Sequence, residues 1–254
     1  MTRKEMMSFL NNRAAVEEMR ASENFKKSNH CWNVQSYNKK RSIGYLMKLI
    51  NDCHPRTLED WVHFYLSDGY ELELEMLENP DVFVKERGRS FRYLKGIARR
   101  FQQDLADYSE IEISEDEAFK YVLIRVFYET FDGYLREKNT KFTLQGFFKH
   151  YIVATENSAV GIDAAKLDID YAVDCLMVGR DGTPKCGIQI KSNNFATPSA
   201  KKMNNYKHER FEKETGLPVF YIYADYRGRM EESSLKDLHS YLKKTSFQKE
   251  RVVA

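Results

Sequence analysis

The pattern of hydrophobic and polar residues changes character along the chain. Before about residue 140, apolar positions follow helical spacing within charged segments, as in amphipathic helices. Thr57, Pro80 and the pair Ser114 and Glu117 are typical of helix starts, so this half is expected to be mainly helical. The expected helices are Thr2–Lys27, Ile43–Ile50, Thr57 to Gly69, Pro80 to Tyr108 and 115–138.

Residues 170–192 contain two apolar runs of strand length, separated by a turn. The runs are YAVDCLMV (171–178) and CGIQIK (186–191), and the turn GRDGTPK (179–185) is rich in Gly and Asp. We therefore expect an antiparallel β-hairpin. Residues two apart on a strand face the same side, so Gln189 and Lys191 should project together, with Asp174 beside them on the paired strand.

The segments around the hairpin predict further helices and one more strand. We expect a helix over Thr143–Glu156, a helix over Thr197–Gly216, a buried strand over Leu217–Ala224 and a closing helix over Ser233–Lys244. This order favours an α/β (α+β) fold with a mixed sheet flanked by helices. The 254 residues suit one domain or two closely packed ones, with a soft boundary between 1–142 and 143–254.

The hairpin groups residue types that suit metal-assisted phosphodiester hydrolysis. A carboxylate (Asp174) and an amide oxygen (Gln189) are oxygen ligands of the kind Mg²⁺ prefers. Lys191 can act there as a general base or as a charge stabiliser, and both roles stay open. The alternative to a catalytic role is that the strand lies at the edge of the sheet and the Lys191 side chain is simply exposed to water. Further acids that could face the metal, or be solvated loop carboxylates, are Asp163, Asp168, Asp170 and Glu156.

Asp174, fifteen residues before Gln189-Ile190-Lys191, resembles the PD-(D/E)XK nuclease signature in its (Q/E)-x-K form. Two departures are that no Pro precedes Asp174 and that Gln189 replaces the usual acid. The order of elements over 143–245 resembles the αβββαβ core of that superfamily. The run WNVQSYNKKRSIGYLMKLINDCHPRTLEDW (32–61) is similar to the MjaI type of type II restriction endonuclease.

The resemblance implies a Mg²⁺-dependent endonuclease that cleaves double-stranded DNA at a specific sequence and works as a homodimer, with Mn²⁺ able to substitute. It also favours Asp163, because some enzymes of this form present their acid in a similar GxD setting. A structure-specific repair or recombination nuclease and an inactive DNA-binding module are the alternatives, and a helical interaction factor is a third. The implied catalytic and metal-binding residues are Asp174, Gln189, Lys191, Glu156 and Asp163, with main-chain Ile190 as a further metal ligand.

DNA contacts must come from local basic surfaces, because the net charge is only +2. The stretch 33–42 combines amides that suit adenine edges with basic residues that suit phosphates or guanine. A second basic group lies in 85–100 and a third follows the hairpin, where it includes Lys207 and His208. Each group could equally be a solvated face. The candidate contacts are Asn33, Gln35, Ser36, Asn38, Lys39, Lys40, Arg41, Arg92, Lys201 and Lys202.

The spacing of cysteines and the absence of several known motifs argue against other classes of protein. The four cysteines form no C-x-x-C pair, and Cys175 and Cys186 are expected to be small buried hydrophobes. The sequence contains no P-loop, G-x-S-x-G or G-x-G-x-x-G motif. With no signal peptide and no apolar run of 18 residues, a cytoplasmic protein without membrane contact is expected.

Overall fold

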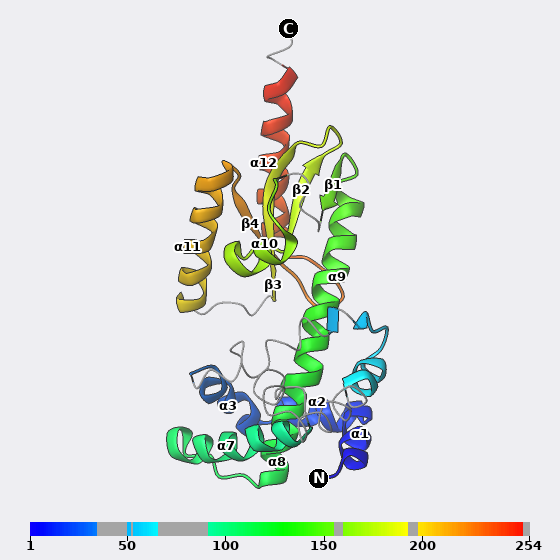
Figure 1. The fold of residues 1–254 in the computed structure, drawn as a ribbon, viewed down its shortest axis with the longest axis vertical. Coiled ribbons are helices and arrows are strands. Elements are labelled where there is room, and N and C mark those ends of the chain that lie inside the picture. Colours follow the sequence, from blue (N-terminus) through cyan, green and yellow to red (C-terminus); the bar gives the residue numbers. More distant parts are fainter. Residues whose placement is uncertain (35–49, 52, 66–90, 155–159, 193–197, 251–254) are drawn as a thin grey trace, which may run out of the picture. The chain divides into compact units, whose positions relative to one another are not determined.

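The computed structural model describes residues 1–34, 50–51, 53–65, 91–154, 160–192 and 198–250 (Figure 1). The chain forms two compact units, Met1–Tyr134 and Leu135–Ala254, and the division falls inside one helix, α9 (Thr130–Phe147). From the sequence we assign DNA recognition and dimerisation to residues 1–142 and the nuclease catalytic core to 143–254, and this assignment stays a prediction.

The described part of the first unit is helical, as expected. The single helix expected over Thr2–Lys27 is wrong, because the chain breaks at Asn12 and Ser22. The side chains of these two residues accept hydrogen bonds from the main-chain N–H groups of Ala15 (3.2 Å) and Phe25 (3.2 Å), so each starts a new helix. The helices are α1 (Arg3–Asn11), α2 (Arg13–Ala21), α3 (Glu23–Val34), 58–65, α7 (Phe91–Ser109), α8 (Glu115–Leu123) and a π-helix, η2 (Ile124–Glu129).

Thr57 and Ser114 cap helices as predicted. Thr57 Oγ1 accepts from the N–H of Asp60 at 3.1 Å, and Ser114 Oγ accepts from the N–H of Glu117 at 3.1 Å. Only this half of the capping box expected at Ser114 and Glu117 is present, since Glu117 Oε1 accepts from the hydroxyl of Tyr121 at 2.8 Å. The helix begun at Ser114 does not end near residue 138, since α8 continues through η2 into α9. The predictions for Pro80 and for most of Ile43–Ile50 fall outside the described residues.

The second unit contains a mixed four-stranded sheet in the order β1-β2-β3-β4. The β1–β2 and β2–β3 pairs are antiparallel, and β3 and β4 are parallel. The order α9-β1-β2-β3-α11-β4 confirms the expected fold class, with one added helix, α10. The bounds are β1 (Tyr151–Ala154), α10 (Ala164–Tyr171), β2 (Cys175–Gly179), β3 (Pro184–Lys191), α11 (Pro198–Thr215), β4 (Val219–Tyr223) and α12 (Glu232–Glu250).

One expectation in this unit is wrong. The helix expected over Thr143–Glu156 ends at Phe147, and its second half contains strand β1 instead. Asp168 and Asp170, which could be metal-facing acids or solvated loop carboxylates, lie on helix α10. A helix there is stabilised by Asp163, whose Oδ1 accepts from the N–H of Lys166 at 3.3 Å as an N-cap.

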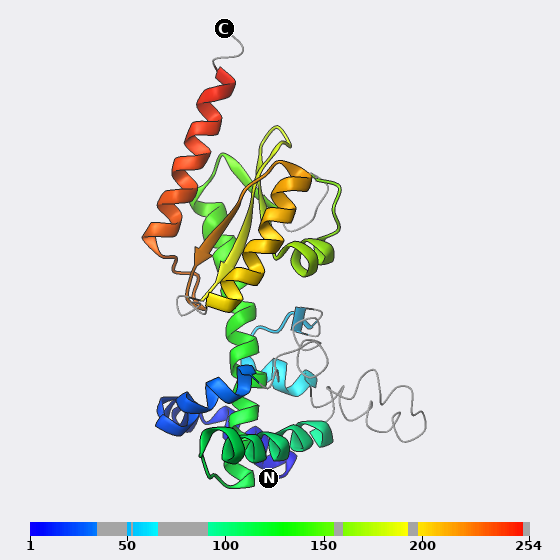
Figure 2. The same cartoon turned by 90° about the vertical axis from the view of Figure 1, so that its left-hand side faces the viewer.

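Helices cover both faces of the sheet (Figure 2), and an apolar core lies on each side of it. On one face, Cys186, Ile188 and Ile190 of β3 pack with residues of α9 and α12. On the other face, Leu176 and Val178 of β2 pack with residues of α10 and α11. We call these the α9/α12 face and the α10/α11 face. The burial of Cys175 and Cys186 in the first core confirms that they act as small hydrophobes.

The turn after β4 contacts α9 closely. Asn139 Nδ2 donates to the carbonyl oxygen of Tyr226 at 2.9 Å. Gly228 has a φ of 77°, and a Cβ placed on it would lie 2.6 Å from the carbonyl carbon of Asn139. Only glycine therefore fits this position without displacing the turn from α9.

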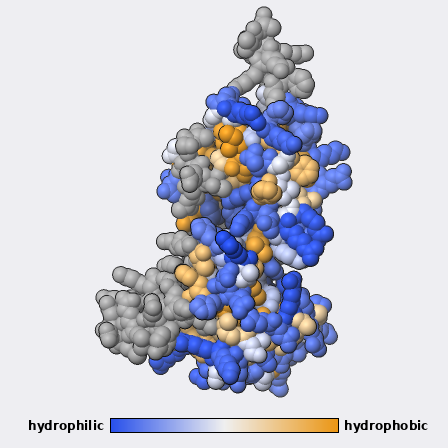
Figure 3. Space-filling view, turned by 90° about the vertical axis from the view of Figure 1, so that its right-hand side faces the viewer, coloured by the Kyte–Doolittle hydropathy of each residue, from blue (hydrophilic) through white to orange (hydrophobic). Residues whose placement is uncertain are grey.

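On the face drawn in Figure 3, hydrophilic residues predominate and apolar atoms form small separate areas. In the described part of the chain, the most exposed large apolar side chains include Phe142, Phe147 and Tyr206. No helix among the described residues has the length and apolar character needed to cross a membrane.

Candidate active site

Asp174, Gln189 and Lys191 come together at one end of the hairpin. The main-chain N–H of Asp174 donates to the carbonyl oxygen of Ile188 at 2.8 Å, which places Asp174 opposite Gln189. Asp174 Oδ2 in turn accepts from the N–H of Ile190 at 2.5 Å. The Asp174 carboxylate is thus held beside β3 by a main-chain N–H of that strand.

Gln189 is buried, with 2 % of its surface exposed. Its side-chain oxygen, Oε1, has no hydrogen-bond partner among the described residues. A buried acceptor left unpaired costs about 1–3 kcal/mol. An unpaired buried oxygen of this kind needs an explanation. A cation bound between this oxygen and Asp174 would provide one, because hard cations bind oxygen ligands.

Lys191 lies at the end of an inner strand. Strand β3 pairs with β2 on one side and β4 on the other, so the edge-strand alternative is wrong. Strand alternation places Lys191 and Gln189 on the α10/α11 face, whereas Ile188 and Ile190 enter the other core. The side chain of Lys191 is half-buried, and the alternation of the strand sets the face of the sheet from which it projects.

The electrostatics of Asp174 show that several charged groups share this end of the sheet. Burial raises the pKa of Asp174 to about 7, the Lys191 ammonium opposes this rise, and the carboxylates of Glu137 and Asp168 contribute to it. Desolvation and Glu137 likewise raise the pKa of Asp168, while Lys191 lowers it. Carboxylates crowded together in this way favour the binding of a cation.

Glu137 and Lys141 were missed by sequence reasoning. Both are on α9, and the Lys141 Nζ donates to Glu137 Oε1. Desolvation acts to lower the pKa of the Lys141 ammonium, but the nearby carboxylates of Glu137 and Asp174 give a net rise. The i, i+4 spacing of Glu137 and Lys141 was a usable signal, but residue 138 was taken as the end of a helix.

The other predicted acids have different surroundings. Asp163 is exposed and caps α10, as described above. Asp170 forms an ion pair with Arg210 at 4.0 Å. Glu156 lies outside the described residues. Of the acids named from the sequence, the structure brings Asp168 close enough to act electrostatically on Asp174.

Helix α11 holds the segment that leads into Asp174. Lys207 Nζ donates to the carbonyl oxygen of Ile169, and His208 Nε2 lies 3.3 Å from the carbonyl oxygen of Ala172. Ala172 has a φ of 55°, which a non-glycine residue seldom adopts. Lys207 and His208 therefore face α10, although the sequence had grouped them with candidate DNA contacts.

The candidate DNA contacts are only partly described. Asn33, at the end of α3, and Arg92, on α7, are exposed. Lys201 and Lys202 are on α11, and Lys202 is exposed. The remaining candidates lie outside the described residues, namely Gln35, Ser36, Asn38, Lys39, Lys40 and Arg41.

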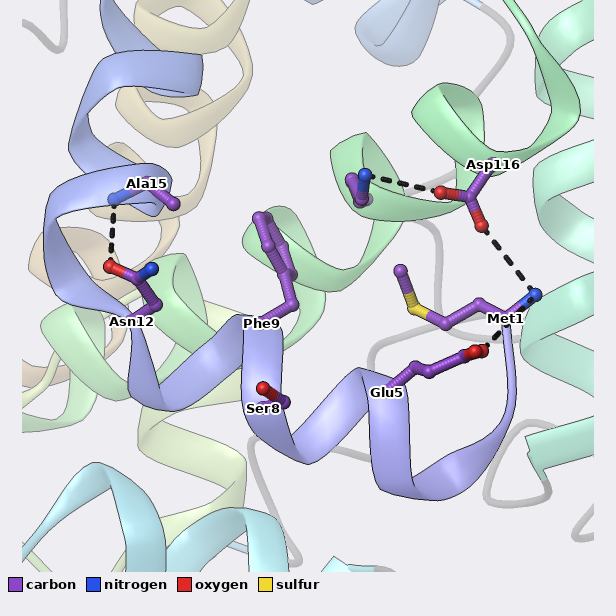
Figure 4. Close-up of a pocket in the computed structure, with 8 residues that line it drawn as sticks. Met1, Glu5, Ser8, Phe9, Asn12, Ala15 and Asp116 are labelled. Carbon is purple, nitrogen blue, oxygen red and sulfur yellow. Dashed lines mark hydrogen bonds and ion pairs between the residues drawn. The ribbon is translucent and has the colours of Figure 1, made fainter.

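A polar pocket of about 480 Å³ in the first unit is distinct from this site (Figure 4). Asp116 in its wall pairs with Lys120 at 3.1 Å and with the amino group of Met1 at 3.5 Å. These charged groups of the pocket wall thus form ion pairs with one another. Across the described ranges, no three His, Cys, Asp or Glu side chains are grouped as a metal site, so a cation would also need amide or main-chain oxygens.

These features define the class of protein: a nuclease-like α+β unit with an acid, an amide and a lysine on a central hairpin. The model of one protein family, described as MjaI restriction endonuclease, matches residues 28–236. The chain belongs to this MjaI restriction endonuclease family. Neither a curated protein nor a solved structure matches it.

Family membership establishes the activity at a coarse level. The protein is a type II restriction endonuclease, a hydrolase that cuts DNA at a specific sequence. Restriction endonucleases generally use a divalent metal ion.

Proposed function

We propose that the protein cleaves double-stranded DNA by Mg²⁺-dependent hydrolysis at the site formed by Asp174, Gln189 and Lys191. The observation that carries this proposal is the buried, unpartnered Oε1 of Gln189 opposite a carboxylate whose pKa is raised to about 7. An unpaired amide oxygen and a crowded carboxylate are both stabilised by a bound cation.

The oxygen atoms at this site fit a hard divalent cation. Asp174 and Gln189 supply side-chain oxygens, and Glu137 supplies the added acid that the sequence sought in Glu156 or Asp163. The N–H of Ile190 points to Asp174, and in a strand the carbonyl of the same residue points to the same side. Ile190 can therefore add a main-chain oxygen. A bound Mg²⁺ would lower the pKa of water and neutralise phosphate charge, and Mn²⁺ should substitute.

Lys191 acts on the phosphodiester. Its ammonium can neutralise charge that develops on the phosphate or orient the attacking water. Lys191 pairs with Tyr223 of β4, and its carbonyl oxygen accepts from the N–H of Ala224 at 2.9 Å, so its main chain is held by β4. Such a fixed charge stabilises a transition state without reorganisation.

Sequence recognition is assigned to segments outside the hairpin, because the hairpin must treat every phosphodiester alike. The amides and basic residues of 33–42 are proposed to recognise the bases of the DNA sequence. Arg92, Lys201 and Lys202 are proposed to contact its phosphates. A two-fold dimer would place one site on each strand of a palindromic sequence, so a homodimer is part of the proposal.

Cleavage of long natural DNAs with Mg²⁺, and with EDTA as the control, tests this function. We expect discrete fragments from the native protein and none from Asp174→Asn, which replaces a charged ligand with a neutral one. Cutting of branched substrates alone would favour a repair nuclease. Specific DNA binding without cutting in either metal would indicate an inactive module. Full activity of Asp174→Asn would overturn the proposed site.

A further inference from the structure

Two tyrosines on β4 lie beside the proposed catalytic residues. Parallel pairing of β3 and β4 sets Tyr221 next to Gln189 and Tyr223 next to Lys191. Neighbouring residues in register on adjacent strands face the same side of a sheet, at a strand spacing of about 4.8 Å. Both tyrosines therefore project from the α10/α11 face, where Lys191 also projects.

Contacts within this face fix the two rings. The rings of Tyr221 and Tyr223 stack with centroids 5.9 Å apart and an interplanar angle of 9°. The Tyr221 ring also contacts the ring of His208 on α11 at 5.0 Å, and its hydroxyl donates to Asn205 Oδ1 at 3.1 Å. Tyr221 is thus held by α11, and Tyr223 is held in turn by Tyr221.

The main chain of Tyr223 is also held on two sides. The next residue, Ala224, donates its N–H to the carbonyl oxygen of Lys191 at 2.9 Å. The carbonyl oxygen of Tyr223 accepts from the N–H of Glu231 at 2.8 Å. A long side chain on such a fixed backbone, with its ring stacked, loses little entropy when it binds a ligand.

We propose that Tyr223 is a further catalytic residue, whose hydroxyl donates a hydrogen bond to the phosphate group on which Lys191 acts. The inference rests on the proposed function. Tyrosine hydroxyls are common donors to DNA phosphates, and two donors side by side stabilise a phosphate whose charge shifts during hydrolysis. Tyr221 is not assigned this role, because it lies in register with Gln189, whereas Tyr223 lies in register with Lys191.

Tyr223→Phe tests this role, because it removes the hydroxyl and keeps the stacked ring. We expect single-turnover cleavage of long natural DNA in Mg²⁺ to fall at least tenfold. Binding of the same DNA in Ca²⁺ should change less than threefold, and the thermal midpoint should be unchanged. Tyr241→Phe is the matched control, since that hydroxyl donates to the carbonyl oxygen of Lys185 on the α9/α12 side. It should cleave at the native rate.

Four outcomes would overturn the inference. They are a Tyr223→Phe rate within twofold of native, an equal loss in Tyr241→Phe, a loss that higher Mg²⁺ restores, and a rate loss matched by an equal loss of DNA binding. Lys191→Ala, assayed in parallel, separates the two proposals. If it is inactive while Tyr223→Phe is fully active, only the role of Tyr223 fails; if it cleaves normally, the proposed active site fails.

Discussion

The two faces of β3 differ in what their residues do. Cys186, Ile188 and Ile190 are all buried and join the apolar core under α9 and α12. On the opposite face, Gln189 is equally buried but has an unpaired oxygen, and Lys191 is half-buried. One strand thus combines side chains that stabilise the fold with side chains that cost stability.

This difference shows how a single strand can hold catalytic side chains in place. The apolar face fixes the main chain of β3, so the polar face is held without using its own side chains for packing. Residues of the apolar face should therefore affect stability when changed, and residues of the polar face should affect catalysis. Four predictions, from the largest expected effect to the smallest, test this separation.

Lys191→Ala should reduce cleavage at least a thousandfold, about 4 kcal/mol in the barrier. The physical reason is loss of a fixed positive charge at the phosphate, so DNA binding in Ca²⁺ should change little. Single-turnover assays and equilibrium binding measure the two effects. Lys243→Ala, an exposed lysine of α12, is the control. Retention of more than about a tenth of the native rate, roughly 1.4 kcal/mol, would remove Lys191 from the mechanism.

Ile188→Ala, on the apolar face, should lower the free energy of unfolding by about 2–5 kcal/mol, because it leaves a cavity in a packed core. Cleavage per folded molecule should stay near native. Denaturant unfolding, combined with rates corrected for the folded fraction, measures both. A loss of catalysis as large as that of Lys191→Ala, at unchanged stability, would abolish the separation between the faces.

Gln189→Glu and Gln189→Ala should differ by at least about tenfold in cleavage, roughly 1.4 kcal/mol. The glutamate keeps an oxygen ligand and adds charge, so metal affinity should rise or hold and cleavage in Mn²⁺ should survive. The alanine loses the ligand. Calorimetric titration with Mn²⁺ and cleavage rates measure the effects. Equal, full activity in both variants would mean that Gln189 only packs.

Glu137→Gln should weaken divalent metal binding and slow cleavage severalfold, because one of the crowded carboxylates loses its charge. Asp163→Asn is the comparison, since asparagine caps a helix about as well as aspartate. It should leave metal affinity and cleavage unchanged. If Asp163→Asn is inactive and Glu137→Gln is native-like, the second acid is Asp163.

The hairpin and its three residues could be predicted from sequence because the signals are local. Strand alternation and a Gly- and Asp-rich turn suffice to place Gln189 beside Lys191. Glu137 could not be found in this way, because it reaches Asp174 through the packing of α9 on the sheet. The end of that helix was also misjudged, since η2 interrupts the α-helical period before it.

The π-helix contains a buried charge whose partners no local pattern reveals. Arg125 in η2 is 3 % exposed and lies over the rings of Phe25 (4.2 Å) and Trp32 (5.1 Å) of α3. Its Nη2 donates to Ser28 Oγ at 2.7 Å. Desolvation lowers the pKa of Arg125 to about 10. These partners are about 100 residues away in sequence, so spacing within the helix does not predict them.

The close contact between Gly228 and Asn139 matters for any mutational scan of this enzyme. Gly228 touches no proposed catalytic group, yet every side chain there would collide with the main chain of α9 two residues from Glu137. A screen scored by restriction of incoming phage would therefore class Gly228 with the active-site positions. Measuring protein abundance in the same library would separate the two groups, because loss of Gly228 depletes the folded protein whereas loss of Lys191 leaves it intact.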